Sequence, residues 1–483
     1  MKKIDALRRR AGAWATAGLV CALAAGCAVN PVTGRRQFVT ISEAQEIQLG
    51  QQAATEVSQS LGLVDNAALQ EYVQRVGAEL ARESERPNLP WTFRVVEDPT
   101  PNAFALPGGF IFLTRGMMDL MDSEAELAAV LGHEIGHVTA RHSVSMISRA
   151  QLAQLGLGLG SIFFPSAAQT FGGLAQTGMQ LLFLSYGRDA ERQADDLGFK
   201  YALRENYDVR EMDDIFATLL RIGQAEGRSA LPSWLSSHPS EPERIRTAQA
   251  RADTVTRGPL ALRRDEYLAR IDGLVYGDDP RQGFFRDGVF LHPELRFRID
   301  FPQGWRTQNL PQAVNALAPQ QDAILQLTLA QGTNAEGAAR RFLSQQGIRP
   351  GQGSRQSVNG NPAVVSYFQA QTQQGVVTGM VAFIEHGGHT YQVLAYTPAQ
   401  AFSRYEPAFR RVIGSFDEVN DPAVLNVRPN RVDVVRIARP MTLAEFNRQY
   451  PSVIPLAELA ILNQVANESA TLPAGLVKRV VQE

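Results

Sequence analysis

Residues 123–143 read SEAELAAVLGHEIGHVTARHS, and this stretch decides how the first half of the chain folds. Ser123, followed three residues later by Glu126, forms the S-x-x-E pattern of a capping box at the start of a helix. Apolar residues then recur at helical spacing, at Leu127, Val130, Leu131, Ile135 and Val138. The stretch is therefore predicted to be a helix that carries an H-E-x-x-H sequence in its second half.

The H-E-x-x-H residues predict a metal site. His133 and His137 are four residues apart, just over one helical turn, so both imidazoles leave the same face of the helix. Glu134 lies beside them, in a position to hold a water. Zinc suits such a site because three protein ligands leave a fourth position for that water, whose pKa then falls towards neutrality.

The third ligand must come from another part of the chain. A metzincin needs a histidine at position 143 and a glycine at position 140, but Ser143 and Ala140 stand there, so this class is excluded. The segment 188–195 (RDAERQAD) offers Glu191 with Asp195 four residues later, on one helical face. Asp195 would then orient a ligand histidine by a hydrogen bond, although such a pair is more often a solvated face. The residues themselves leave open, as third ligand, Glu191, Glu205 and Glu211.

The N-terminus has the pattern of an export signal. Five basic residues precede a mostly apolar, uncharged run over 11–26, and the small residues before Cys27 resemble a bacterial lipobox. We expect residues 1–26 to be a signal peptide, Cys27 to carry lipid, and residues 27–41 to form a tether to the membrane. The predicted location is the periplasm, at the inner leaflet of the outer membrane. The second cysteine, Cys21, lies inside the signal, so residues 28–483 contain no cysteine.

Composition excludes some classes of function. The chain has 47 basic and 49 acidic residues, a formal charge of −2, which provides no electrostatic basis for binding nucleic acid. Its 44% hydrophobic content is that of a globular protein. Residues 150–187 contain no charge, but glycines and Pro165 interrupt any continuous apolar span. We expect a helical hairpin here that covers the site or touches the membrane surface, with a buried core hairpin as the alternative.

Periodicity divides the remainder into elements and domains. The predicted fold class is α+β, with a mostly helical domain over 42–275 that contains two helices over 42–84 and a small sheet. A Gly/Asp/Pro stretch at 276–283 marks a boundary, and alternating runs over 286–418 predict a small α+β domain. The tail over 430–483 is predicted to run strand, helix, helix, strand.

Five ordered motifs together resemble the HtpX- and BepA-like metallopeptidases, relatives of the CAAX prenyl endopeptidase. They are NPVTGRRQ (30–37), PNAFALPGGFIFLTRGM (101–117), AAVLGHEIGHVTARHS (128–143), SYGRDAERQAD (185–195) and SSHPSEPERI (236–245). The resemblance implies a zincin-like, gluzincin domain with one zinc ion per subunit, held by His133, His137 and Glu191. It also implies that Glu134 is the general base.

The resemblance carries two further expectations. An extended polypeptide substrate would add to the edge of a sheet, along the strand formed by Asn102, Ala103, Phe104 and Ala105. Residues 109–112 are expected to belong to the same edge. His238 would occupy the open zinc position and hold the enzyme latent, whereas its plain interpretation is a loop histidine that caps a helix. The tail resembles a LysM-like module, which suggests contact with peptidoglycan.

Two functions follow from these features. The first is a zinc endopeptidase that hydrolyses misfolded or misassembled envelope proteins. The second is an envelope assembly or peptidoglycan-binding protein whose C-terminal domains do the main work and whose proteolysis is minor or latent.

Overall fold

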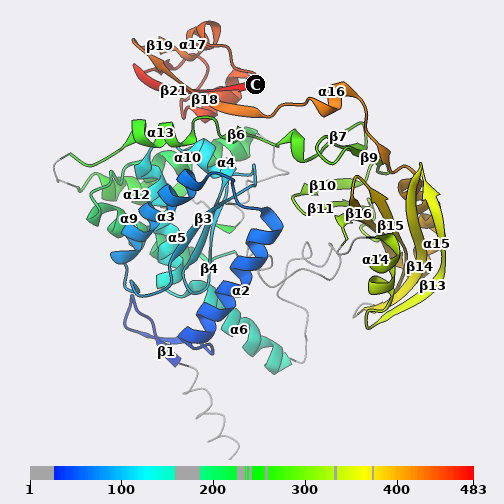
Figure 1. The fold of residues 1–483 in the computed structure, drawn as a ribbon. Coiled ribbons are helices and arrows are strands. Elements are labelled where there is room, and N and C mark those ends of the chain that lie inside the picture. Colours follow the sequence, from blue (N-terminus) through cyan, green and yellow to red (C-terminus); the bar gives the residue numbers. More distant parts are fainter. Residues whose placement is uncertain are drawn as a thin grey trace, which may run out of the picture.

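Helices surround a three-stranded sheet in the first part of the chain (Figure 1). The strands are β3 (Thr92–Val96), β4 (Ala103–Leu106) and β5 (Phe110–Thr114). The helices are α2 (Glu43–Leu61), α3 (Ala67–Arg82), α4 (Arg115–Leu120), α5 (Glu124–Thr139), α6 (His142–Leu157), α9 (Arg188–Arg204), α10 (Glu211–Ala225), α12 (Pro242–Ala252) and α13 (Arg264–Ile271). The computed structural model describes residues 27–157, 185–225, 234, 237–238, 242–255, 259–330, 334–372 and 375–482.

The order of the strands corrects one expectation about the edge of this sheet. β5 lies in the centre, parallel to β3 and antiparallel to β4. Residues 110–112 therefore have partners on both sides and do not belong to an edge, whereas β4 is an edge strand. The period-2 pattern identifies a strand but does not say which of its neighbours pairs with it.

Helix α5 is more deeply buried than its apolar stripe predicts. All of its 16 residues are buried, because α3, α9, α10 and the sheet pack around it. Ser123 caps the helix as expected, by accepting a hydrogen bond from the Glu126 N–H. The reciprocal half of the capping box is absent, since the Glu126 carboxylate accepts from the Asp122 N–H at 2.7 Å.

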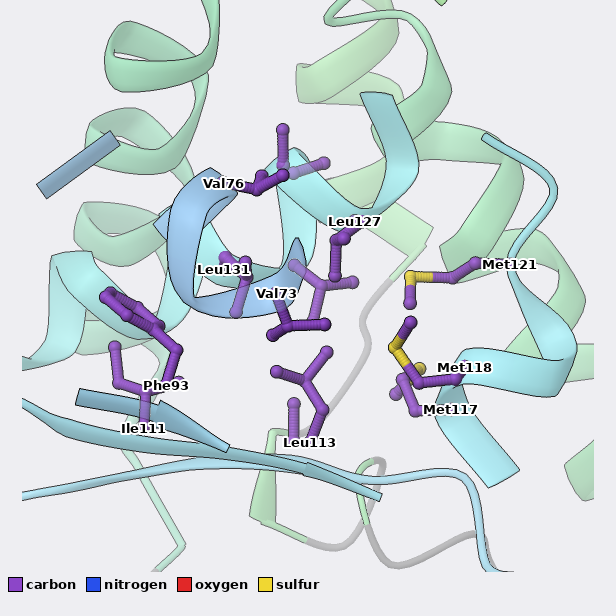
Figure 2. Close-up of a cluster of buried hydrophobic side chains, with 14 of the residues drawn as sticks. Val73, Val76, Phe93, Ile111, Leu113, Met117, Met118, Met121, Leu127 and Leu131 are labelled. Atoms are coloured by element: carbon purple, nitrogen blue, oxygen red, sulfur yellow. The ribbon is translucent and has the colours of Figure 1, made fainter. Parts of the chain in front are cut away.

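One apolar core joins α3, α5 and the sheet (Figure 2). Side chains from these elements point towards one another, and a group of methionines closes one end of the cluster. This packing fixes the helix that carries the H-E-x-x-H residues against a rigid sheet. The labelled members are Val73, Val76, Phe93, Ile111, Leu113, Met117, Met118, Met121, Leu127 and Leu131.

Helix α9 begins at Arg188, and residues 185–187 before it are not helical. The helical hairpin predicted over 150–187 lies mostly outside the described residues, since α6 is described only to Leu157. No helix among the residues that the structure describes is long and apolar enough to cross a membrane.

Residues 284–418 form two antiparallel sheets with two helices. The larger sheet has seven strands in the order β10-β11-β12-β16-β15-β14-β13, and α14 (Ala335–Leu343) and α15 (Phe402–Gly414) pack on opposite faces of it. The strands are β7 (Phe284–Arg286), β8 (Val289–His292), β9 (Phe297–Asp300), β10 (Arg306–Leu310), β11 (Ala313–Leu317), β12 (Ile324–Leu329), β13 (Ile348–Val358), β14 (Asn361–Thr372), β15 (Gly375–His386), β16 (His389–Pro398) and β17 (Asp417–Glu418). Strand β13 is not predicted by periodicity, because it is an exposed edge strand that contains Pro350 and two glycines and so lacks an alternating pattern.

The tail has the predicted strand, helix, helix, strand order. It consists of β18 (Asn430–Ile437), α17 (Leu443–Gln449), α18 (Leu456–Leu462) and β21 (Gly475–Gln482), with the short pair β19 (Met441–Thr442) and β20 (Thr471–Leu472). β18 pairs with β21 and also with β6 (Val275–Tyr276), so this module adds to the end of the first domain (Figure 1). Its likeness to LysM stays a prediction.

The residues expected to form a tether include a small hairpin against the first domain. β1 (Cys27–Val29) pairs with β2 (Arg36–Phe38). Between them, Asn30 is buried and donates a hydrogen bond to the Ala140 carbonyl at the end of α5. The hairpin therefore lies close to the end of the helix that carries His133 and His137.

Lys478 joins the C-terminal module to the first domain. Its side chain is fully buried, and Nζ donates to the carbonyls of Asp119, Leu120 and Met121 at 3.0, 3.2 and 3.0 Å. It also forms an ion pair of 2.7 Å with Asp122. These carbonyls end α4 directly before the cap of α5, where a cation satisfies acceptors that the helix itself leaves unpaired.

We predict that Lys478→Met lowers the free energy of unfolding by about 3 kcal/mol, because a carboxylate and three carbonyls lose their buried partner. The neighbouring Arg479→Met is the control, since Arg479 pairs with Asp433 in a partly exposed ion pair and should cost at most about 1 kcal/mol. Urea unfolding followed by circular dichroism measures both, and equal losses would contradict the assignment.

Candidate metal centre

Four buried side chains from three segments converge on one point. His133 and His137 come from α5, Glu191 from the first turn of α9, and His238 from the segment that follows Trp234. One ligand atom from each lies within 4.8 Å of the others. The Nε2 atoms of the two α5 histidines are 3.0 Å apart, and His238 Nδ1 is 3.2 Å from His133 Nε2 and 3.0 Å from Glu191 Oε1.

Small residues bring the backbones of α5 and α9 together. A Cβ atom on Gly198 would lie 2.8 Å from the His133 backbone nitrogen, and one on Gly136 would lie 3.0 Å from the Ala194 Cα. Side chains at these positions would push the helices apart, because real Cβ contacts are not this short. The close approach brings Glu191 within 3.4 Å of His137 Nε2.

A pair of charged residues supports the ligands from the side of α9. Asp195 lies one turn after Glu191, and its Oδ1 is 2.9 Å from His133 Nδ1. Nε2 of the same ring therefore points towards the ligand cluster. Arg244 of α12 contacts Glu191 at 2.8 Å and Asp195 at 2.7 Å. The two carboxylates are therefore buried together with a cation between them.

The other α5 histidine has supports to which the sequence analysis assigned no role. His142 Nδ1 lies 2.9 Å from His137 Nδ1, and its Nε2 lies 3.0 Å from Gln193 Oε1. Tyr186 stacks on the His137 ring with centroids 3.9 Å apart, and its hydroxyl contacts Ser143 Oγ at 2.7 Å. The only sequence signal was the presence of His142 and Tyr186 within two of the resemblance motifs.

Glu134 differs from the other carboxylates of the site. It is completely buried, and neither carboxylate oxygen has a hydrogen-bond partner among the described residues. Its Oε1 lies 3.5 Å from His238 Nε2. A buried carboxylate is costly without partners, so this one is placed for a group that binds between it and the ligands.

Burial and the neighbouring charges set the protonation of the cluster. Burial lowers the pKa of His137 well below its usual range, which favours the neutral imidazole that binds a metal. Burial opposes ionisation of Glu191, but His238 and His137 outweigh it and hold the pKa of Glu191 low. Burial likewise opposes charge on His238, but Glu134 and Glu191 raise its pKa overall. Two imidazole donors on one helix, the Glu191 carboxylate and a second carboxylate without a hydrogen bond beside them fit the donor set of a zinc site.

The other predicted site residues lie apart from this cluster. Asn102 precedes β4, and Ala103, Phe104 and Ala105 lie on it, next to α5. Cys27 lies on β1. The alternative third ligands are also elsewhere, because Glu205 ends α9 and Glu211 contacts Ser123 Oγ at the start of α10.

Comparison with known proteins agrees with this geometry. Residues 67–252 match peptidase family M48. The chain is 31% identical over 258 residues to a beta-barrel assembly-enhancing protease of Yersinia pestis, a match that covers 52% of each protein. It is 32% identical over 220 residues to the mitochondrial metalloendopeptidase OMA1 of Schizosaccharomyces pombe, covering 45% of this chain and 64% of that protein.

These matches leave part of each protein unmatched. The chain spans about half the length of the first curated relatives it matches. Among solved structures, cyanobacterial PsbP from Synechocystis is 13% identical with a TM-score of 0.23, covering 27% of this chain and 91% of that one. A likeness of that size supports no conclusion about this chain. The match to peptidase family M48 over 67–252 includes the two histidines of α5, Glu191 and His238, so the chain resembles this family in the segment that contains the ligand cluster.

Proposed function

We propose that this chain is a zinc-dependent endopeptidase. The observation that carries the proposal is the buried convergence of His133, His137 and Glu191 beside the unpartnered carboxylate of Glu134. Zinc bound by the three ligands would polarise the scissile carbonyl and lower the pKa of a water. The match to peptidase family M48 and the names of two relatives, one a protease and one a metalloendopeptidase, support the same chemistry.

Individual residues around the ligand cluster have separate roles in the proposed reaction. Glu134 takes the proton of the attacking water and later transfers it to the leaving amine. This role requires a carboxylate that accepts no hydrogen bond from another protein group. Asp195 keeps the His133 ring in the tautomer whose Nε2 faces the ligand cluster. His142 and Tyr186 fix the orientation of His137 in the same way.

β4 is the proposed substrate edge. Asn102 and Thr114 form a hydrogen-bonded pair, since the Thr114 N–H donates to the Asn102 carbonyl at 2.9 Å. In an antiparallel ladder such pairs alternate, so the N–H and C=O groups of Ala103 and Ala105 point away from β5. Both residues are buried, so substrate binding requires that this edge be uncovered, and no hydrogen bond among the described residues uses these groups. An extended peptide can pair with them whatever its side chains are.

The proposed substrates are misfolded or misassembled proteins of the cell envelope. The export-type N-terminus supports a periplasmic location, and the proposed lipid on Cys27 would hold the enzyme at a membrane, at the inner leaflet of the outer membrane. The beta-barrel assembly-enhancing proteases among the relatives agree with an envelope role. We also propose that the C-terminal module is LysM-like and that contact with peptidoglycan would localise the enzyme.

The decisive experiment tests Glu134. We predict that Glu134→Gln retains bound zinc but lowers the cleavage of unfolded casein by at least about 100-fold, because the general base is lost while the ligands remain. Zinc content by mass spectrometry and the chelator-sensitive cleavage rate are measured together. Glu71→Gln, an exposed position on α3, is the matched control. Persisting cleavage by the Glu134 variant would reject this role.

A second test concerns the support of His133. Asp195→Asn should weaken zinc affinity by about 10- to 100-fold, because the amide no longer fixes the ring as the carboxylate does. Competition with a chelator of known affinity measures this. Asp189→Asn lies on the same helix with a fully exposed side chain and should bind zinc as the parent does. Equal affinity in all three proteins would show that Asp195 serves only its ion pair with Arg244.

A third test concerns His238, which we propose occupies the open zinc position and keeps the enzyme latent. It is buried, stacks on Trp234 with centroids 5.1 Å apart and faces both Glu134 and Glu191. His238→Ala should raise casein cleavage several-fold while zinc remains bound. His292→Ala, in the second domain, should leave the rate unchanged. A lower or unchanged rate in the His238 variant would contradict the latch.

A further inference from the structure

A second group of buried charges lies at the opposite end of α5 from its N-cap. Glu46 of α2 has a side chain that is 1% exposed, and it forms no part of the ligand cluster. Its carboxylate accepts from Arg86 at 2.8 and 3.1 Å and from Arg141 Nε at 3.0 Å. It also accepts from the Gly108 N–H at 3.3 Å. One carboxylate thus serves donors from three separate segments.

Two of these segments belong to the proposed catalytic machinery. Arg86 also donates to the Val138 carbonyl in the last turn of α5, one residue after His137. Arg141 directly follows the C-cap of α5. Gly108 lies in the turn that joins β4 to β5, and β4 is the proposed substrate edge. Glu46 therefore connects the end of the metal-binding helix to the turn of the hairpin that would hold the substrate.

The backbone at both contacts is specialised for this link. Arg141 has φ of 58°, a left-handed conformation that costs a residue with a Cβ atom free energy and persists where surrounding contacts hold it. At the hairpin, a Cβ on Gly50 would lie 1.8 Å from the Pro107 carbonyl oxygen. A Cβ on Gly108 would lie 2.7 Å from the Ile47 Cα, so α2 lies directly against the turn.

The charges of this group balance only as a set. Arg86 and Arg141 are both buried, and Glu46 is the buried anion between them. Glu43, the second acidic partner of Arg86, has a side chain that is 66% exposed. Loss of charge at Glu46 would leave two buried guanidinium groups without their shared partner, whereas loss of charge at Glu43 would not.

We propose that Glu46 is a positioning residue for substrate binding. It fixes the β4–β5 hairpin relative to the end of α5, and so sets the position of β4 relative to the ligand cluster. This role rests on the proposed peptidase function, because it assumes that substrate pairs with β4. The carboxylate does not touch the substrate. It acts through the turn at Gly108, and its loss should change binding of substrate more than the chemical step.

The test compares Glu46→Gln with Glu43→Gln. The glutamine keeps the size of the side chain and an acceptor for the Gly108 N–H, but removes the charge. Hydrogen–deuterium exchange is measured on peptides that cover 103–112 and 124–139, together with zinc content, kcat and KM for casein-derived peptides. Glu46→Asp, which keeps the charge on a shorter side chain, is the second variant if the glutamine variant does not fold.

For Glu46→Gln we expect faster exchange over 103–112, unchanged exchange over 124–139, unchanged zinc content and a KM raised by about fivefold with kcat within about twofold of the parent. Glu46→Asp should shift in the same direction by less, and Glu43→Gln should match the parent. Faster exchange in both segments with loss of zinc would overturn the proposal in favour of a general stabilising role, and so would unchanged exchange and KM. If the parent does not cleave peptides, the proposed function fails, but the exchange data still decide whether Glu46 positions the hairpin.

Discussion

The close approach of α5 and α9 is the constraint on which the rest of the site depends. His133 and His137 share one face of α5, but a face of one helix supplies only two ligands. Gly136 and Gly198 let the second helix approach until backbone atoms of the two helices limit the contact. At that separation Glu191 lies beside both imidazoles, although more than 50 residues separate it from His137 in the chain. A side chain at either glycine would move the carboxylate away.

Burial of so much charge near one point requires partners on every side. Asp195 and Arg244 balance the ligands from α9 and α12, while His142 and Tyr186 hold His137 from the start of the next helix and the segment before α9. Arg86 and Arg141 share the carboxylate of Glu46 in a separate group at the end of α5, where Arg86 also pairs with the more exposed Glu43. Glu134 differs from these residues, because its oxygens have no hydrogen-bond partner among the described residues.

The C-terminal module stabilises the other end of the same helix. Lys478 is one of only two lysines after the first 26 residues, in a chain whose cations are otherwise arginines. Its compact ammonium group fits three carbonyls and a carboxylate at the end of α4, where a planar guanidinium would match the geometry poorly. Residues 359 positions apart are thereby joined directly before the cap of α5. Both ends of the metal-binding helix are thus held by buried charges from distant segments.

The sequence by itself determined the local structure and part of the chemistry. Ser123 at the start of a helical pattern predicted α5, and four-residue spacing placed His133 and His137 on one face, because both features depend only on neighbours along the chain. Periodicity also identified β9, β12, β14, β15 and β16, but not β10, β11 or β13, the last of which is exposed and lacks alternation. Only the tertiary structure decided which acid lies beside the histidines, that β5 is central rather than an edge, and that His142, Arg244 and Glu46 support the site. These contacts join residues far apart in sequence, and helical or strand periodicity states which face is buried without stating what packs against it.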